Sequence, residues 1–401
     1  MIQKRIFSLS AIIFLGVLAR FLAVIIVGDQ HVDNEWGVML KNLEENNILS
    51  IRDVNGQPMP NVFMPPLYPL FLYVIKFFFS QLNIFLYVVY FIQILLSAIS
   101  IYLTYKILLE FYSENICKIG TLIYSIFPLN IYGASQISSI TLQLFFINLF
   151  ILGFVFLIKY KNLYGIITFS ISAGFLMLLR GEFFIFFLFS LIFYLLKTKD
   201  YKRFFLGLLI SIIVISPYLV RNYQIFEVVT ITKSGGYNLL KGNNPKSLVE
   251  GKAMMGFVRD VVPEVKNELD SLKANKKYDL MFDDILLNQA IIFIKEDPSR
   301  YIYLYSKRVV SFLFIDLEST YPGYYSILHI IPKLVIAITT FFSIIFLFRF
   351  KFNLYSYFIL YYLLNIGLFS VFFILPRYSL SLLTIQIILS LYWIKKFFPK
   401  L

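Results

Sequence analysis

The sequence predicts an all-α polytopic membrane protein with about ten transmembrane helices, two interfacial helices on the outer side and a small α-rich extracytoplasmic lobe. Of its 401 residues, 59% are hydrophobic and only 15% are charged, whereas soluble domains average about a half and about a quarter. The hydrophobic residues come in runs of about twenty, which is the length that a helix needs to cross the hydrocarbon core. Basic residues gather in the short segments between alternate runs, as they do in cytoplasmic loops.

Ten runs are long enough to cross the membrane. They lie at residues 6–27, 84–109, 116–133, 139–158, 163–180, 183–197, 203–220, 327–348, 354–375 and 379–397. Two more apolar segments, 67–79 and 301–315, are shorter than a comfortable span, and the second contains Lys307 and Arg308. The first run is too long for the core of a cleaved signal peptide, and it lacks a small-residue cleavage site.

The basic residues predict the topology. With a cytoplasmic N-terminus and ten crossings, fifteen of them fall inside: Lys4, Arg5, Lys106, Lys118, Lys159, Lys161, Lys197, Lys199, Lys202, Arg203, Arg349, Lys351, Lys395, Lys396 and Lys400. If both short segments crossed as well, the eight basic residues between positions 106 and 203 would move outside. If only one crossed, the C-terminal cluster would move instead. We therefore predict that both short segments lie in the outer interface.

The chain divides into three parts on this topology. Residues 1–220 form an N-terminal transmembrane module that includes a first outer loop at 28–83, residues 221–326 form an extracytoplasmic lobe, and residues 327–401 form the C-terminal transmembrane helices. The formal charge of +13 reflects the basic cytoplasmic loops, so no nucleic-acid partner is expected. The single cysteine excludes a disulfide framework, and with only two histidines a histidine-built zinc centre is not expected.

Arginines stand out because the chain has only 11 of them against 25 lysines. Three lie at the outer ends of predicted spans, against the usual charge bias: Arg180, Arg221 and Arg377. Arg20 lies within the first span. Charges in such places are costly and usually face a polar cavity or a partner, and guanidinium is a natural clamp for phosphate. The alternative is that each arginine reaches the headgroups or pairs with an acid, as Glu182 allows for Arg180.

Three arginines at one depth on three spans favour a shared anionic site. Arg221 and Arg377 are the stronger candidates, and Lys233 and Lys241 in the second outer loop are further ones. The first outer loop supplies the opposite charge directly after span one, in Asp33 and Glu35. A carboxylate held at the membrane surface can act as a general base toward a hydroxyl group, although an acid in a loop is more often simply solvated.

These features together resemble the GT-C membrane glycosyltransferases, in particular the dolichyl-phosphate-mannose–protein mannosyltransferases and the lipid A aminoarabinose transferases. The similarity covers most of the chain. Its more specific elements are Arg20, the acids of the first loop, the Pro-Pro-x-Tyr-Pro-x-Phe-Leu motif within 64–72, Leu-Leu-Arg-Gly-Glu at 178–182, 217–223, 235–245 and Pro-Arg-Tyr at 376–378.

The resemblance implies an inverting glycosyltransferase that moves a sugar from a polyprenyl-phosphate carrier to a glycan, lipid or protein acceptor on the outer side of a membrane. The Lys- and Asn-rich composition and the lack of an organelle address favour a bacterial inner membrane. The resemblance places the general base on Asp33. Asn34 separates Asp33 from Glu35, whereas the family often has adjacent acids, so either carboxylate can be the base. A family glutamate near the fourth span is replaced by Ser138-Ser139, which leaves a divalent metal possible but not required.

Two other functions fit a protein of this class. A transporter or flippase of lipid-linked sugars would share the spans and the arginines, but we find neither internal repeats nor interrupted spans of the kind that such proteins use. A non-catalytic membrane scaffold would use the outer lobe to bind a partner. Sugar transfer is the activity that distinguishes the three.

Overall fold

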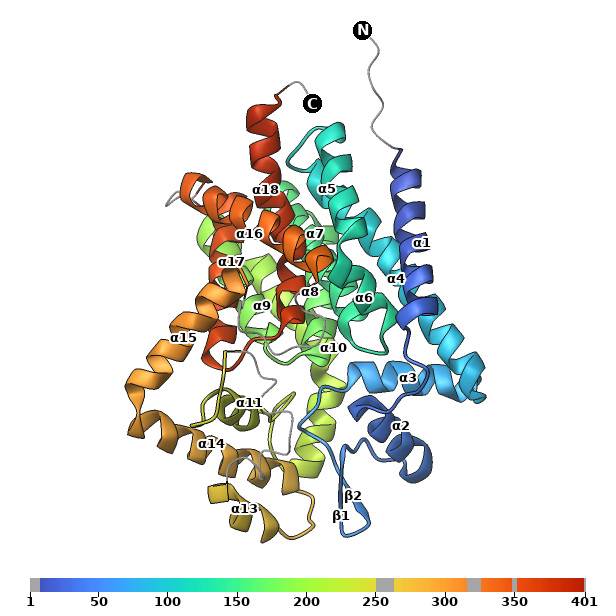
Figure 1. Cartoon of the computed structure of the whole chain (residues 1–401), viewed down its shortest axis with the longest axis vertical. Coiled ribbons are helices and arrows are strands. Elements are labelled where there is room, and N and C mark those ends of the chain that lie inside the picture. The colour runs from blue at the N-terminus through green and yellow to red at the C-terminus, as the bar shows by residue number, and fades with distance from the viewer. Residues whose placement is uncertain (1–7, 250–262, 316–325, 348–351, 400–401) are drawn as a thin grey trace.

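The computed structural model describes residues 8–249, 263–315, 326–347 and 352–399. Five of the basic residues used to predict the topology lie outside these ranges: Lys4, Arg5, Arg349, Lys351 and Lys400. Long helices run side by side as a bundle, and the shorter elements gather at one end of it (Figure 1). We call this end the lobe side. Helix α1 starts and helix α18 finishes at the opposite end.

The bundle helices follow the predicted crossings in order. They are α1 (Leu9–Val27), α4 (Leu82–Leu109), α5 (Glu114–Ile126), α6 (Pro128–Ser135), α7 (Ile140–Tyr160), α8 (Leu163–Leu179), α9 (Phe183–Thr198), α10 (Tyr201–Phe226), α16 (Ile327–Leu347), α17 (Leu354–Val371) and α18 (Leu383–Phe397). Within the described residues, seven segments are long and apolar enough to cross a membrane, while α8 and α9 are shorter. The all-α membrane fold class is confirmed, but the number of ten spans is not.

Two predicted spans are not single α-helices. The run at 116–133 divides into α5 and α6, because Pro128 disfavours a helical conformation at the residue before it and Phe127 is extended. The run at 379–397 begins within the 3₁₀ helix η2 (Pro376–Leu382), and only then becomes α18. The expectation of uninterrupted helices is therefore wrong at these two places.

The core of the bundle lies around α7, which packs between α4 and α8. Gly153 of α7 permits the close approach, since a Cβ there would lie 2.5 Å from the backbone nitrogen of Phe169 in α8. A buried polar group also joins distant helices: the Asn148 side chain donates to the Tyr124 hydroxyl at 2.9 Å and accepts from Thr384 at 2.6 Å. These contacts satisfy polar groups that would be costly to bury alone.

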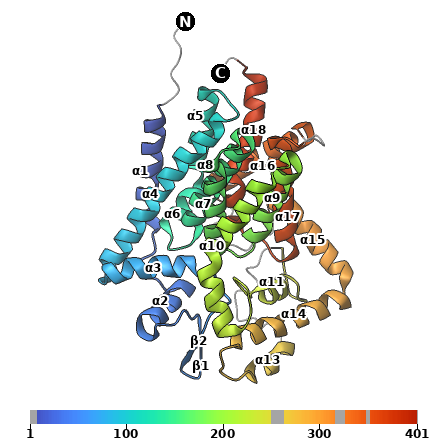
Figure 2. The same cartoon turned by 180° about the vertical axis from the view of Figure 1, so that it is seen from behind.

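Two stretches far apart in sequence build the lobe side. The first supplies α2 (Glu35–Asn46), the hairpin of β1 (Arg52–Val54) and β2 (Gln57–Met59), and α3 (Leu67–Phe78). The second supplies α11 (Gly235–Gly242), α13 (Pro263–Asp270), α14 (Tyr278–Glu296) and α15 (Pro298–Leu313). Both views place the two stretches at the same end of the bundle (Figures 1 and 2). Helix α3 lies across that end, as the interfacial prediction for 67–79 requires.

A buried ion pair joins these two stretches. Arg52 of β1 bonds to Asp279 of α14, and the Asp279 carboxylate also accepts from the backbone nitrogens of Val62 at 3.0 Å and Phe63 at 3.2 Å. The guanidinium carbon of Arg52 lies 4.4 Å from the ring centre of Phe63 and 3.9 Å from that of Phe282. The pair therefore fixes the first outer loop against α14.

We expect Arg52→Gln to lower the free energy of unfolding by about 3 kcal/mol, because it leaves a buried carboxylate without its cation. The Asp279 side chain is only 1% exposed. The midpoint of thermal unfolding in detergent measures the change. Lys277→Gln is the matched control, since it breaks an exposed ion pair with Glu227 in the same lobe; an equal loss in both variants would contradict the structural role of Arg52.

The predicted topology places both outer loops on one side of the membrane. Asn55 and Asn275 are both exposed and both lie on the lobe side, so Asn55→Cys and Asn275→Cys should react with a membrane-impermeant maleimide from outside the cell. The native Cys117 is fully buried and should contribute little background. Labelling of either position from the cytoplasmic side alone would overturn this topology.

Candidate functional site

Positive side chains from three elements gather on the lobe side. Lys241 comes from α11, Arg377 from η2, and Arg180 from the end of α8. Aromatic rings connect them: the Lys241 ammonium lies 4.9 Å from the ring centre of Phe373, and the Arg180 guanidinium lies 4.7 Å from that of Tyr378. Phe373 and Tyr378 are themselves neighbours, with ring centres 6.1 Å apart. We call Arg180, Lys241 and Arg377 the cation cluster.

The members of this cluster differ in how their charge is balanced. Arg180 donates to the Glu182 carboxylate at 2.6 Å, as the sequence allowed. Arg377 is exposed, and neither it nor Lys241 forms an ion pair within the described part of the chain. Burial lowers the pKa of Lys241, the nearby charge of Arg377 lowers it further, and Glu35 opposes both. Two cations without a paired acid are thus available to an anionic ligand.

Glu35 is the acid whose charge acts on Lys241 of the cation cluster. It is the first residue of α2, and it is exposed. Its charge acts on Lys241 and also on Tyr237, whose pKa is raised by burial, lowered by Arg52 and raised again by Glu35 and Tyr378. The Glu35 charge is therefore felt by residues of α11.

Helix α11 is held in place by residues that sequence reasoning did not assign to the site. Arg308 of α15 is fully buried, bonds to the Gly242 carbonyl and donates to the Asn243 side chain at 3.2 Å. Asn243 in turn donates to the Val371 carbonyl at 2.9 Å. At the other end of α11, the buried Asp283 carboxylate accepts from the backbone nitrogen of Tyr237 at 2.8 Å. The glycine- and asparagine-rich motif at 235–245 was the one signal that pointed to this arrangement.

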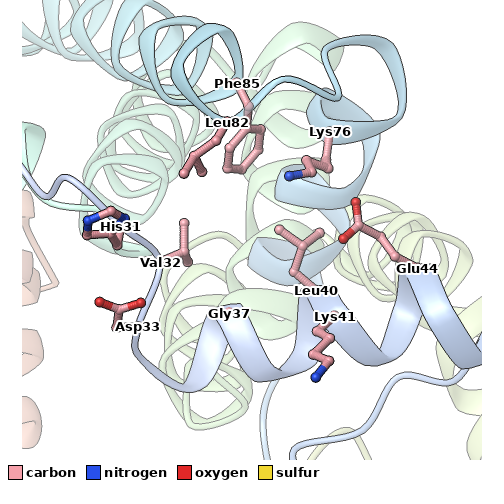
Figure 3. Close-up of a pocket in the computed structure, with 10 residues that line it drawn as sticks. All are labelled: His31, Val32, Asp33, Gly37, Leu40, Lys41, Glu44, Lys76, Leu82 and Phe85. Atoms are coloured by element: carbon pink, nitrogen blue, oxygen red, sulfur yellow. The ribbon is translucent and has the colours of Figure 1, made fainter.

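Asp33 lines a pocket that no residue of the cation cluster lines. It precedes α2 and is exposed, and this pocket lies between α2, α3 and the start of α4 (Figure 3). The pocket face of α2 carries Gly37, Leu40, Lys41 and Glu44, which recur at the three- and four-residue spacing of one helix face. Glu35 falls off this face. The two candidate bases, only two residues apart in sequence, thus point to different places.

The remaining predicted site residues have protein partners. Arg221 donates to the Asn61 carbonyl at 2.7 Å and to the Asn222 side chain at 2.7 Å. Lys233 pairs with Asp284 at 2.9 Å. Arg20 is fully buried between α1, α4 and α5, where it donates to the carbonyls of Gly16 and Ser125 at 2.8 Å each. In this arrangement Arg20 has no surface to offer a ligand, and Arg221 anchors the first outer loop.

The described residues contain no group of three or more histidine, cysteine or acidic side chains arranged to hold a metal ion. Asp29, the other acid near the end of α1, accepts from the backbone nitrogen of Ile137 at 2.7 Å. Its carboxylate therefore stabilises the turn before α7.

No family model matches the sequence, and no curated protein matches it. Among solved structures, the chain is similar to the oligosaccharyltransferase AglB from Archaeoglobus fulgidus in complex with an inhibitory peptide and a dolichol-phosphate. The TM-score is 0.52 at 13% identity, over 98% of this chain and 50% of that one. A structure of the oligosaccharyltransferase from the same organism, tethered to an acceptor peptide, gives a TM-score of 0.50 at 12% identity, over 97% and 50%.

The structure of ArnT from Cupriavidus metallidurans in the apo state gives a TM-score of 0.39 at 10% identity, over 95% of this chain and 76% of that one. This chain spans about half the length of the archaeal enzyme, with 50% of that chain covered. At such identities the likeness concerns the fold. The GT-C-like membrane fold that the sequence predicts is confirmed.

Proposed function

We propose that this protein is an inverting glycosyltransferase that moves a sugar from a polyprenyl-phosphate carrier to an acceptor at the lobe side of the membrane. The proposal is supported by the GT-C-like fold together with the charges of Arg377 and Glu35, which both act on Lys241. Membrane lipid, the carrier and a glycan, lipid or protein acceptor are its partners, and a bacterial inner membrane with an outward-facing site is its expected place.

The reaction needs a base for the acceptor hydroxyl on one face of the sugar and positive charge to stabilise the departing phosphate on the other. A carboxylate such as Glu35 would take the proton of the acceptor hydroxyl as its oxygen attacks the anomeric carbon, and such a base contributes about 10²–10⁴-fold. The bond to the carrier phosphate breaks on the other face, so the configuration inverts. The departing phosphate is already an anion, so no general acid has to protonate it.

Lys241 and Arg377 would stabilise that departing phosphate. Charge on the leaving oxygen grows in the transition state, and cations fixed by the protein stabilise it without having to reorganise. Tyr237 and Tyr378, both partly exposed, lie near Lys241 and Arg180 respectively, and would offer aromatic faces against which a sugar ring can pack. The Glu35 carboxylate is negatively charged and would not bind the carrier phosphate. Its proposed role is to take the proton of the acceptor hydroxyl.

Carrier binding should depend on pH through Lys241. Burial and Arg377 lower the pKa of this lysine, so in the free protein it loses its proton at a lower pH than an ordinary lysine. We therefore expect the affinity for a polyprenyl phosphate to fall as pH rises above neutral through that pKa. Lys241→Met should bind more weakly and lose this pH dependence; an identical alkaline decline in Lys241→Met would assign it to another group.

Sugar transfer itself tests the proposal. Purified protein in nanodiscs is given radiolabelled polyprenyl-phosphate sugars together with a membrane extract as the source of acceptor. Transfer of label with inverted anomeric configuration supports a glycosyltransferase. Movement of the intact labelled lipid between leaflets without transfer would instead identify a flippase, and binding without either reaction would identify a scaffold.

A further inference from the structure

The pocket that contains Asp33 is a second feature of the lobe side, separate from the cation cluster. It encloses about 220 Å³ between α2, α3 and the start of α4. Leu40, Leu82 and Phe85 form its apolar part, and charged side chains stand around them (Figure 3). Nothing in the proposed transfer reaction uses this space, so its chemistry calls for its own explanation.

The charges that line the pocket balance. Lys41 and Lys76 contribute two positive charges, Asp33 and Glu44 contribute two negative ones, and His31 is the remaining titratable residue. Lys76 and Glu44 lie on one side of the pocket in Figure 3, while Asp33 lies at the other end. The Lys76 ammonium lies 5.2 Å from the centre of the Phe85 ring. Lys41 lies 4.0 Å from Glu45 on its own helix. A site that offers the Lys76 ammonium and the Glu44 carboxylate on one side of the pocket suits a ligand that carries both signs of charge.

The surroundings of the pocket are those of a lipid-facing surface. Helix α3 lies across the end of the bundle, and its outer face carries exposed Val74, Phe77 and Phe78. Helix α4 continues that surface with exposed Leu82, Ile84 and Tyr87. Contiguous apolar side chains at the end of membrane helices mark the boundary between headgroups and acyl chains. Acyl chains could follow α4 while their headgroup enters the pocket.

We propose that this pocket binds the headgroup of a phospholipid with a primary amine, of the phosphatidylethanolamine type. Lys76 binds the phosphate, while Glu44 accepts hydrogen bonds from the ammonium group. A quaternary ammonium headgroup has no N–H to donate and needs aromatic faces instead, and Phe85 is the one aromatic residue of the lining. An anionic headgroup would leave the Glu44 carboxylate without a partner. The inference is independent of the proposed glycosyl transfer.

Native mass spectrometry of the purified full-length chain, exchanged into equimolar phosphatidylethanolamine, phosphatidylcholine and phosphatidylglycerol with identical acyl chains, tests this site. We expect phosphatidylethanolamine to be retained about tenfold or more over each of the others, as one hydrogen bond to a charged group would give. Lys76→Gln and Glu44→Gln should each remove most of that preference. Lys295→Gln, an exposed lysine of α14, should keep it.

Equal retention of the three lipids by the wild-type protein would overturn the proposal, and that measurement needs no variant to fold. A preference for phosphatidylglycerol would identify an anionic lipid site and overturn it as well. So would a preference that survives in both Lys76→Gln and Glu44→Gln. Size-exclusion profiles that match the wild type establish that a variant's lost preference reports on the pocket.

Discussion

Glu35→Gln should lower the turnover number for sugar transfer by about 10²-fold or more, because the amide keeps the shape of the carboxylate but cannot take a proton. Donor binding should change little, since Glu35 carries the same sign of charge as the carrier phosphate. Single-turnover transfer from a labelled donor, with donor affinity measured separately, distinguishes the two effects. A matching loss of donor affinity would show that Glu35 acts through the cation cluster rather than on the acceptor.

Asp33→Asn is the comparison that decides between the two acids. Asp33 lines the α2–α3–α4 pocket and not the cation cluster, so this variant should keep transfer within about tenfold of the wild type, less than the loss of a general base. The resemblance to the GT-C enzymes had placed the base on Asp33. If Asp33→Asn lost transfer and Glu35→Gln kept it, that original assignment would stand; if both variants remained active, the base mechanism would be wrong.

Removing the unpaired cations should weaken carrier binding strongly. We expect Arg377→Ala and Lys241→Met each to raise the Kd for a short-chain polyprenyl phosphate about 10- to 100-fold, which corresponds to the loss of one hydrogen-bonded charge. Arg377→Lys should fall between Arg377→Ala and the wild type, because an ammonium group cannot replace the two-pronged guanidinium contact. Isothermal titration calorimetry in detergent at fixed ionic strength measures all of these values.

Arg221→Lys serves as the contrast for that series. Arg221 is committed to the carbonyl of Asn61 and to Asn222, so we expect lower thermal stability but an unchanged Kd for the folded fraction. The sequence had ranked Arg221 with Arg377 as a phosphate ligand. A Kd for Arg221→Lys that rises as much as that of Arg377→Lys, at unchanged stability, would return Arg221 to the site.

The sequence by itself determined the features that depend on neighbouring residues. Runs of apolar residues and the basic turns between them set the order of the bundle helices, since hydrophobic length and loop charge act locally along the chain. The same reasoning separated 67–79 from the spans, and α3 does lie across the end of the bundle. It also singled out Glu35, Lys241 and Arg377 as candidate site residues.

Only the tertiary structure decided which of those charged side chains have protein partners. The sequence offers no reason to prefer Asp33 or Glu35 as the base. In the structure α2 begins at Glu35, and Asp33 lines the α2–α3–α4 pocket whereas Glu35 does not. Arg221 and Arg377 both lie at the ends of predicted spans. In the structure Arg221 donates a hydrogen bond to the carbonyl of Asn61, 160 positions away in sequence. Arg308, which marked a doubtful span, is buried against α11. Such pairings depend on packing between segments that are distant in sequence, and local patterns of hydropathy and charge carry no information about them.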